Sequence, residues 1–280
     1  MADMIINLLF AINDHYLQHL KTTLWSIHCN TKPNIEYHIY VLQQPLLQRN
    51  LELKKFCQQL HMQYYPIIIN DPEFFAEAPV SKRYPLTIYY RLLAHHYLPT
   101  HLQRILYMDA DILCINDFSQ LYQLDLENNY YAAAIHSGLT DLTNVFNKMR
   151  LDTYESDGYY NSGLLLMNLP LIRQHVHAEE IFQTIKNFGK FFLLPDQDIL
   201  NTLYSKHILS IPDEIYNYDT RKKLIYETTS GGQFNLNWTI ENTVFLHYCG
   251  KDKPWQLSYK GNFRELYLHY QHQMLNLTTY

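Results

Sequence analysis

The chain has few of the residues that build phosphate-binding loops and thiol sites. Eight of its 280 residues are glycine, and they form neither the GxGxxG dinucleotide fingerprint nor the GxxxxGK[ST] P-loop. Its four cysteines lie far apart without a CxxC pair, which argues against a structural zinc site and is typical of thiols kept reduced in a cytosol. A phosphate-containing ligand would therefore have to be held by other groups.

A basic excess and a long apolar run are also absent. Lys and Arg number 22 against 27 Asp and Glu, a net charge of −5, so we predict no nucleic-acid partner. No apolar stretch approaches the roughly 18 residues of a membrane span, and Asp3 stands where a signal peptide carries positive charge. These features predict a cytoplasmic protein that meets a membrane peripherally at most.

The sequence does contain an alternation of strand and helix patterns. Hydrophobic residues make up 47% of it, enough for a sizeable core. The apolar run Met4–Ala11 predicts a strand buried on both faces, and helical and strand periods then alternate through 17–27, 35–41, 47–60 and 64–69. This alternation predicts an α/β fold with a parallel-based sheet that binds ligands beyond its C-terminal strand ends. Later strands are expected at 104–108, 132–135, 163–168 and 244–248, and helices at 178–188 and 199–204.

Two acids, Asp109 and Asp111, directly follow the predicted strand 104–108. Along an extended chain, residues two apart lie on the same side, so both carboxylates would point to one place. Two anions at the end of an apolar strand repel each other unless a cation lies between them, which indicates a divalent-metal site. A solvated turn, where Asp is favoured, is the alternative explanation of an isolated DxD.

Three further clusters accompany the acidic pair, and each also has a structural explanation. A helical run follows Asp196-Gln197-Asp198, so one of these acids would act as a helix cap. A strand follows Asn161-Ser162-Gly163, which would then form a turn. The third cluster is the segment from His247 to Lys253, which comes after a strand. Together, two acids, an imidazole and a glycine with a lysine suit a metal-bound diphosphate. Oxygen and imidazole ligands favour Mn²⁺, with Mg²⁺ as the alternative. Gly250 and Lys253 would stabilise charge on a leaving diphosphate.

These motifs resemble glycosyltransferase family 8, which includes the bacterial lipopolysaccharide α-galactosyltransferases and glycogenin. The resemblance covers most of the chain and rests on Phe10-Ala11-Ile12-Asn13-Asp14, Tyr90-Arg91-Leu92, Leu106-Tyr107-Met108-Asp109-Ala110-Asp111, Asn161-Ser162-Gly163, Asp196-Gln197-Asp198 with Ile199-Leu200-Asn201, and His247-Tyr248-Cys249-Gly250 with Lys253-Pro254-Trp255. It implies a GT-A-type nucleotide-diphospho-sugar transferase fold, with a mixed, mostly parallel sheet flanked by helices, over residues 1–255. Residues 256–280 would form a C-terminal helical appendage.

The resemblance also implies an activity and the residues that carry it. The activity would be the retaining transfer of galactose or glucose from a UDP-sugar to a glycan, lipid-linked or glycoprotein acceptor. Mn²⁺ would be bound by Asp109, Asp111 and His247. The donor would be bound by Ala11, Asn13 and Asp14 at the uridine, by Arg91, Asn161 and Asp196 at the hexose, and by Gly250 and Lys253 at the diphosphate, with Asp109 and Ala110 completing the set. The catalytic residues would be Gln197, Asp196 and Lys253.

Two positions depart from the family pattern, and a third bears on mechanism. Asn13 stands where the galactosyltransferases have an acid, and His136 stands where they have an acid near the acceptor. Gln197 occupies the reacting face, and an amide is a poor nucleophile. A double displacement needs a carboxylate nucleophile, so we favour same-face attack by the acceptor hydroxyl, with the leaving phosphate as its base.

Other functions remain open at this point. A haloacid-dehalogenase-like phosphatase also places DxD after an apolar strand, but its motif continues as DxDx[TV], whereas Leu113 occupies that last position here. A non-catalytic nucleotide-sugar binder would keep the same site. The aromatic and basic residues after Lys253 predict a helix packed on the domain or, alternatively, a peripheral contact with the inner face of the membrane.

Overall fold

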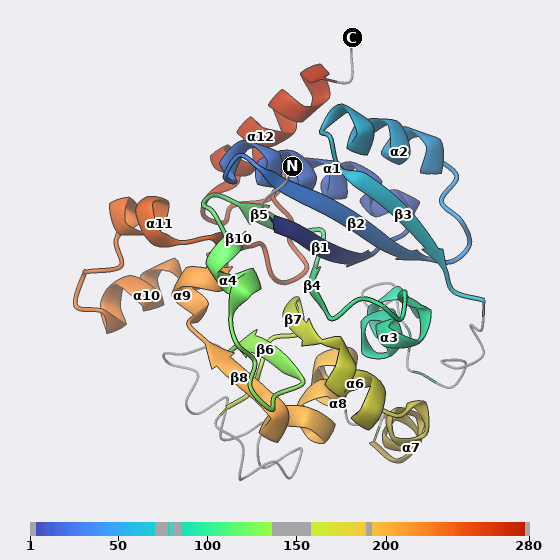
Figure 1. Cartoon of the computed structure of the whole chain (residues 1–280). Helices are drawn as coiled ribbons and strands as arrows, with labels where there is room; N and C mark the ends of the chain where they lie inside the picture. The colour runs from blue at the N-terminus through green and yellow to red at the C-terminus, as the bar shows by residue number, and fades with distance from the viewer. Residues whose placement is uncertain are drawn as a thin grey trace.

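The computed structural model describes residues 4–70, 78, 80, 86–135, 158–188 and 192–277, so His136 lies outside the described residues. The strands (Figure 1) are β1 Met4–Ala11, β2 Ile35–Gln43, β3 Gln63–Ile68, β4 Arg104–Met108, β5 Ile112–Cys114, β6 Tyr131–Ala134, β7 Leu164–Asn168, β8 Ile208–Ile211, β9 Tyr218–Asp219 and β10 Phe245–His247. The α-helices are α1 Leu17–Asn30, α2 Asn50–Gln59, α3 Ala94–Tyr97, α4 Ser119–Gln123, α6 Leu169–His175, α7 Ala178–Phe188, α8 Pro195–Tyr204, α9 Asp213–Tyr216, α10 Lys223–Thr229, α11 Leu236–Asn242 and α12 Arg264–Leu277. Short 3-10 helices are η1 Asp14–Tyr16, η3 Leu86–Leu93, η5 Ser205–His207 and η6 Thr220–Lys222.

A seven-stranded sheet of order β3-β2-β1-β4-β7-β6-β8 forms the centre of the protein. Strands β1 to β4 are parallel, as are β6 and β8, while β7 runs antiparallel to both β4 and β6. The predicted mixed, mostly parallel sheet is thus confirmed. Strand order reverses at β1, which has β2 on one side and β4 on the other. Open α/β sheets bind their ligands at such a reversal, outside the carboxyl ends of the strands.

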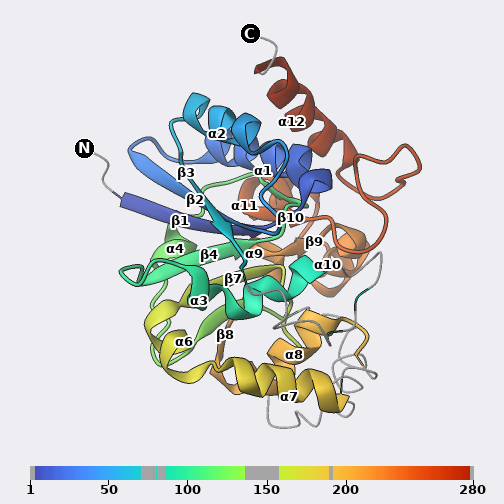
Figure 2. The ribbon, with the colours of Figure 1, turned by 90° about the vertical axis from the view of Figure 1, so that its right-hand side faces the viewer.

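Helices cover both faces of this sheet (Figure 2), with α1, α2 and α12 on one face and α3, α6 and α7 on the other. The side chains of β1 alternate between the two layers. Ile6, Leu8 and Phe10 pack into the core that contains α1 and α2, whereas Leu9 packs into the core that contains α6 and α7, and all four are fully buried. The first strand is therefore buried on both faces, as its unbroken apolar run predicts.

A second, three-stranded sheet has the order β5-β10-β9, with β10 antiparallel to β5 and parallel to β9. Residues 109–111 connect β4 of the large sheet to β5 of the small one. The periodicity of the sequence does not predict β5, β8 and β9, because strands of two to four residues are too short to show a period.

Most predicted elements are present, with ends shifted by a few residues. The segment around Arg91 forms the 3-10 helix η3, and the helix predicted at 199–204 begins at Pro195. The predicted extended conformation of the acidic pair is wrong. Asp109 and Asp111 lie in a turn closed by the Ile112 N–H, which donates to the Asp109 carbonyl at 3.3 Å. The turn, rather than strand periodicity, brings the two carboxylates to one side.

The C-terminal helix α12 packs against α1. Tyr267 and Met274 are buried, the Tyr267 hydroxyl lies 2.9 Å from His19 Nδ1, and Trp25 Nε1 donates to Gln273 Oε1 at 3.1 Å. The indole of Trp255 stacks on His19, with ring centroids 3.5 Å apart. Trp255 and Tyr267, two of the aromatic residues that suggested membrane contact, therefore pack against the rest of the protein.

Among the described helices, none combines the length and apolarity that crossing a bilayer requires. The division of the chain into a glycosyltransferase domain, residues 1–255, and a C-terminal helical appendage, residues 256–280, stays a prediction.

The packing of α12 is tested at two consecutive residues. We expect Met274→Ala to lower the free energy of unfolding by about 2–5 kcal/mol, because it leaves a cavity between α12 and α1. Leu275 is 43% exposed, and Leu275→Ala should change the same quantity by less than about 0.5 kcal/mol. Urea denaturation followed by circular dichroism measures both variants. Equal stability of the two would contradict the docking of α12.

Candidate active site

Segments that are far apart in the sequence meet where β1 and β4 end. The turn after β4 carries Asp109 and Asp111, and the last residue of β10 is His247. Because β7 is antiparallel to β4, the residues just before β7 reach the same edge. The first turn of α8 and the loop after β10 complete the group. The predicted residues that contact one another directly here are Arg91, Asp109, Asp111, Asn161, Asp196, Gln197, His247 and Lys253.

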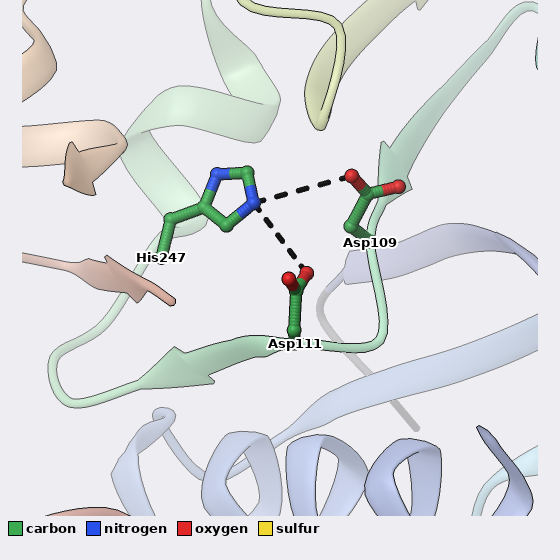
Figure 3. A group of neighbouring side chains, drawn as sticks. All are labelled: Asp109, Asp111 and His247. Atoms are coloured by element: carbon green, nitrogen blue, oxygen red, sulfur yellow. Dashed lines mark ion pairs between the residues drawn. The ribbon is translucent and has the colours of Figure 1, made fainter. Parts of the chain in front are cut away.

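Asp109, Asp111 and His247 form a group whose ligand atoms all lie within 4.8 Å of one another. His247 Nε2 is 4.0 Å from Asp109 Oδ2 and 3.4 Å from Asp111 Oδ1, and both carboxylates face the imidazole (Figure 3). Asp111 and His247 are buried, while the side chain of Asp109 is 27% exposed. Two carboxylates and one imidazole, open to solvent at one side, fit a divalent cation such as Mn²⁺ or Mg²⁺.

The close approach of these ligands depends on the absence of a side chain at Gly163. A Cβ atom there would lie 2.4 Å from His247 Cε1 and 2.7 Å from Asp109 Oδ2. The Gly163 carbonyl also accepts a hydrogen bond from the Asp109 N–H at 2.8 Å. Glycine at this position therefore makes room for two of the three candidate ligands, His247 and Asp109, and fixes the backbone of Asp109.

Arg91 joins the acidic pair to the first turn of α8. Its Nη2 is 2.9 Å from Asp109 Oδ1, its Nε is 3.4 Å from Asp196 Oδ2, and its Nη1 donates to the Ser162 carbonyl at 2.8 Å. The guanidinium lies over the ring of Tyr107, whose hydroxyl donates to Asp109. Burial raises the pKa of Asp196, and the Arg91 guanidinium offsets this only in part. One buried cation thus compensates two of the carboxylates.

Lys253 compensates the third carboxylate. Its Nζ donates to Asp111 Oδ2 and, at 2.9 Å, to the Tyr248 carbonyl. Burial would raise the pKa of Asp111, but the Lys253 ammonium and the His247 imidazole together lower it well below its usual range. The carboxylate is therefore ionised. A cation bound at Asp111 would compete with the ammonium of Lys253 and release it for an anionic ligand.

The acids at the start of α8 have different roles. Asp198 is fully buried, and its Oδ2 accepts hydrogen bonds from the Leu193 and Leu194 N–H groups at 2.7 and 3.1 Å. Asp198 is the fourth residue of α8, and these bonds tie the segment before the helix to it. Asp196 instead contacts Arg91 and accepts from the Ser162 hydroxyl at 2.9 Å. The predicted capping by one of these acids is wrong, because both lie inside α8, whose N-cap residue is Leu194 and makes no side-chain cap hydrogen bond. Asp196 is the acid that belongs to the site.

The predicted uridine-binding residues lie at the end of β1 and in η1. Ala11 is the last residue of β1, and Asn13 Oδ1 accepts from the His15 N–H at 3.1 Å, so the Asn13 amide nitrogen is the end left for a ligand. Asp14 accepts from the Gln48 and Arg49 N–H groups, which ties it to the start of α2. Of the other two predicted donor-binding residues, Ala110 is buried in the core that contains α1 and α2, and Gly250 lies in the loop after β10. Gly250 has a φ of +94°, which favours glycine.

Comparison with known proteins assigns the chain to a family. The sequence profile of Glycosyl transferase family 8 matches residues 7–258. The chain belongs to this family.

A lipopolysaccharide 1,2-glucosyltransferase of Escherichia coli is 29% identical over 255 residues, 89% of this chain and 73% of that protein. General stress protein A of Bacillus subtilis (strain 168) is 26% identical over 276 residues, 96% of this chain and 93% of that protein. A crystal structure of the galactosyltransferase LgtC with donor and acceptor sugar analogs aligns over 96% of each chain, with 22% identity and a TM-score of 0.77.

Family membership confirms the predicted GT-A-type fold and the predicted class of enzyme. The chain belongs to a family of glycosyltransferases, so the phosphatase alternative no longer applies. A nucleotide-sugar donor and a glycan acceptor follow from that class. The family match alone leaves the individual donor, the acceptor and the ion to be argued from the site.

In this family 8 site, sequence reasoning missed Tyr107 and Asn217. Tyr107 supports Arg91 and Asp109 but appears in the sequence as one apolar residue of a buried strand. Asn217 is fully buried and contacts His247 and Asn161. It lies 30 residues before His247 in a segment without a motif, so a single sequence carries no signal for it.

The space at Gly163 gives a direct test of the metal-ligand group. We expect Gly163→Ala to weaken Mn²⁺ binding by on the order of 10–100-fold, because its Cβ would displace His247 and Asp109. Gly231→Ala is the matched control: Gly231 has a φ of +62°, but a Cβ there meets no atom within 4 Å. It should lower stability through backbone strain without changing Mn²⁺ binding. Electron paramagnetic resonance of free Mn²⁺ measures both affinities. Wild-type Mn²⁺ binding by Gly163→Ala would contradict this geometry.

Proposed function

We propose that the protein is a Mn²⁺-dependent, retaining hexosyltransferase that moves galactose or glucose from a UDP-sugar to a cell-surface glycan or glycoprotein acceptor. The observation that carries the proposal is the meeting of Asp109, Asp111 and His247 beside Lys253 at the sheet edge of a family 8 glycosyltransferase. The two hexoses are those named for the E. coli relative and for the aligned crystal structure. The ion would act as a Lewis acid on the leaving diphosphate when bound.

The chain's own residues would bind the donor from both ends. The Asn13 amide nitrogen would donate to a carbonyl oxygen of the base, Ala11 and Asp14 would form the rest of the uridine site, and Ala110 would be a further donor contact. Gly250 and Lys253 would bind the diphosphate. The Lys253 ammonium would leave Asp111 and bind the anionic diphosphate. Arg91, Asn161 and Asp196 would hold the hexose. Backbone and cationic donors placed near developing negative charge are the groups that contribute most to such transfers.

The contacts of Gln197 support same-face attack. Its Oε1 accepts hydrogen bonds from Asn161 Nδ2 at 3.1 Å and from the Ser162 N–H at 3.3 Å. An amide oxygen held by two donors is a still weaker nucleophile than a free one. Asp198 is committed to backbone N–H groups and Asp196 to Arg91 and Ser162. The acceptor hydroxyl would therefore attack on the face that the diphosphate leaves, and transfer its proton to that phosphate.

A non-catalytic nucleotide-sugar binder with the same site is the second candidate. The intact set of acids, imidazole and lysine favours an enzyme over this alternative.

We also propose a cytoplasmic location, at the inner face of the membrane if the acceptor is lipid-linked. Flotation of the full chain with anionic vesicles tests that contact, and recovery only in the soluble fraction would remove it.

Donor hydrolysis tests the proposed activity without knowledge of the acceptor. We expect release of UDP from UDP-galactose or UDP-glucose in the presence of Mn²⁺, and its loss on chelation. Asp111→Asn should lower the rate by on the order of 10²–10³-fold, because it removes a charged ligand from the site of leaving-group stabilisation. Asp117→Asn, at an acid paired with Lys32, is the control and should leave the rate unchanged. UDP binding without turnover of any nucleotide sugar would favour the non-catalytic binder.

Mass spectrometry of the protein during turnover tests the mechanism separately. We expect no covalent glycosyl-enzyme in the wild type, since Asp196 is held by Arg91 and Ser162 and Asp198 by backbone N–H groups. Gln197→Glu introduces one and is expected to trap a glycosyl-enzyme. Isolation of an intermediate on Asp196 or Asp198 of the wild type would overturn same-face attack.

A further inference from the structure

Asn217 contacts both the metal-ligand group and the residues proposed to hold the hexose. It lies between α9 and β9 and is fully buried. Its Oδ1 is 2.8 Å from His247 Nδ1, and its Nδ2 donates to Asn161 Oδ1 at 2.9 Å. One amide group thus contacts both a candidate metal ligand and a candidate hexose-binding residue.

The orientation of this amide follows from a backbone group. The Gly163 N–H donates to Asn161 Oδ1 at 2.9 Å, and a backbone N–H can only donate, so the Asn161 atom at this position is its oxygen. The Asn217 atom that faces that oxygen must then be its nitrogen. Its oxygen therefore faces His247, and Nδ1 of His247 must be the protonated donor. Nε2 is consequently the ring nitrogen directed at Asp109 and Asp111.

The backbone N–H of Ser162 supports the same orientation of the Asn161 amide through Gln197. The Ser162 N–H donates to Gln197 Oε1, so that atom is also an oxygen. Asn161 Nδ2 donates to the same oxygen at 3.1 Å, which agrees with the orientation of Asn161 derived from Gly163. The hydrogen bonds from Gly163 through Asn161 and Asn217 to His247 are consistent throughout.

We propose that Asn217 is a positioning residue that holds the imidazole of His247 for the metal ion and the amide of Asn161 for the donor hexose. The identity of both ligands rests on the proposed function. Metal-ligating histidines are oriented by a partner on their other ring nitrogen, and loss of such a partner weakens metal binding. Here that partner is an amide rather than a carboxylate, and its second hydrogen bond extends the same constraint to Asn161.

The arrangement also limits what Asn161 can recognise. Both acceptor positions of its Oδ1 are used, by the Gly163 N–H and by Asn217 Nδ2, and one of its two amide hydrogens goes to Gln197. One N–H remains. Asn161 would therefore contact the hexose only as a donor to an oxygen, and removal of Asn217 would leave an Asn161 acceptor unsatisfied and free to reorient.

The binding of Mn²⁺ alone tests the first half of the proposal. We expect Asn217→Ala to weaken Mn²⁺ affinity by on the order of 10–100-fold, measured by electron paramagnetic resonance of the free ion. Asn116→Ala is the matched control, because Asn116 Nδ2 makes two hydrogen bonds, to the Ile240 and Thr243 carbonyls, away from the ligands. It should bind Mn²⁺ as the wild type does. Wild-type affinity in a folded Asn217→Ala protein would overturn the proposal.

Asn217→Asp separates positioning from a general loss of structure, and it carries the test if Asn217→Ala does not fold. A carboxylate still accepts from His247 Nδ1 but cannot donate to Asn161, so Mn²⁺ affinity should stay at or above the wild-type value. The UDP-hexose affinity should fall towards that of UDP. Equal loss of Mn²⁺ affinity in both variants would contradict positioning. Failure of the wild type to bind Mn²⁺ would instead contradict the proposed function.

Discussion

Repulsion among the carboxylates of Asp109, Asp111 and Asp196 is the constraint on which the rest of the site depends. All three meet at one edge of the sheet, and two of them are buried. Breaking a buried charge pair by removing one partner costs about 3–5 kcal/mol, so the arrangement is stable only with matched cations. Arg91 supplies one cation to Asp109 and Asp196, and Lys253 supplies the other to Asp111. The two cations are held differently. The Arg91 guanidinium lies over the Tyr107 ring and donates to the Ser162 carbonyl, whereas Lys253 belongs to the loop after β10.

The two sheets explain why these charges can be so close. The chain passes from the large sheet to the small one through the turn at 109–111, and the β10 strand that pairs with β5 ends at His247. Rigid strands thus support the ligands from both sides. Close contact then requires a residue without a side chain at Gly163 and a buried amide at Asn217. Geometry in this site is set by strand ends and hydrogen bonds, and charge balance is set by the two cations, Arg91 and Lys253.

The sequence was sufficient to predict the fold class and the three candidate metal ligands, because these residues belong to local motifs at the ends of apolar strands. It predicted the wrong local structure for Asp109 and Asp111, since a turn and an extended chain both bring residues two apart to one side. It placed the acids of residues 196–198 before the helix, whereas α8 begins at Pro195 and Asp198 accepts from the backbone N–H groups that precede the helix. Asn217 was beyond prediction, because it reaches His247 through the two-residue strand β9, which has no periodicity to detect.

Asp109, Asp111 and His247 are proposed to bind one ion together beside the diphosphate of a nucleotide. Anomalous diffraction at the manganese edge, from crystals grown with UDP and Mn²⁺, tests it most directly. We expect a single strong peak coordinated by all three side chains, with the UDP diphosphate against it and Lys253 moved from Asp111 to the phosphate. A manganese peak that lacks Asp111 or His247 as a ligand, or UDP bound away from this edge of the sheet, would contradict the shared binding of one ion.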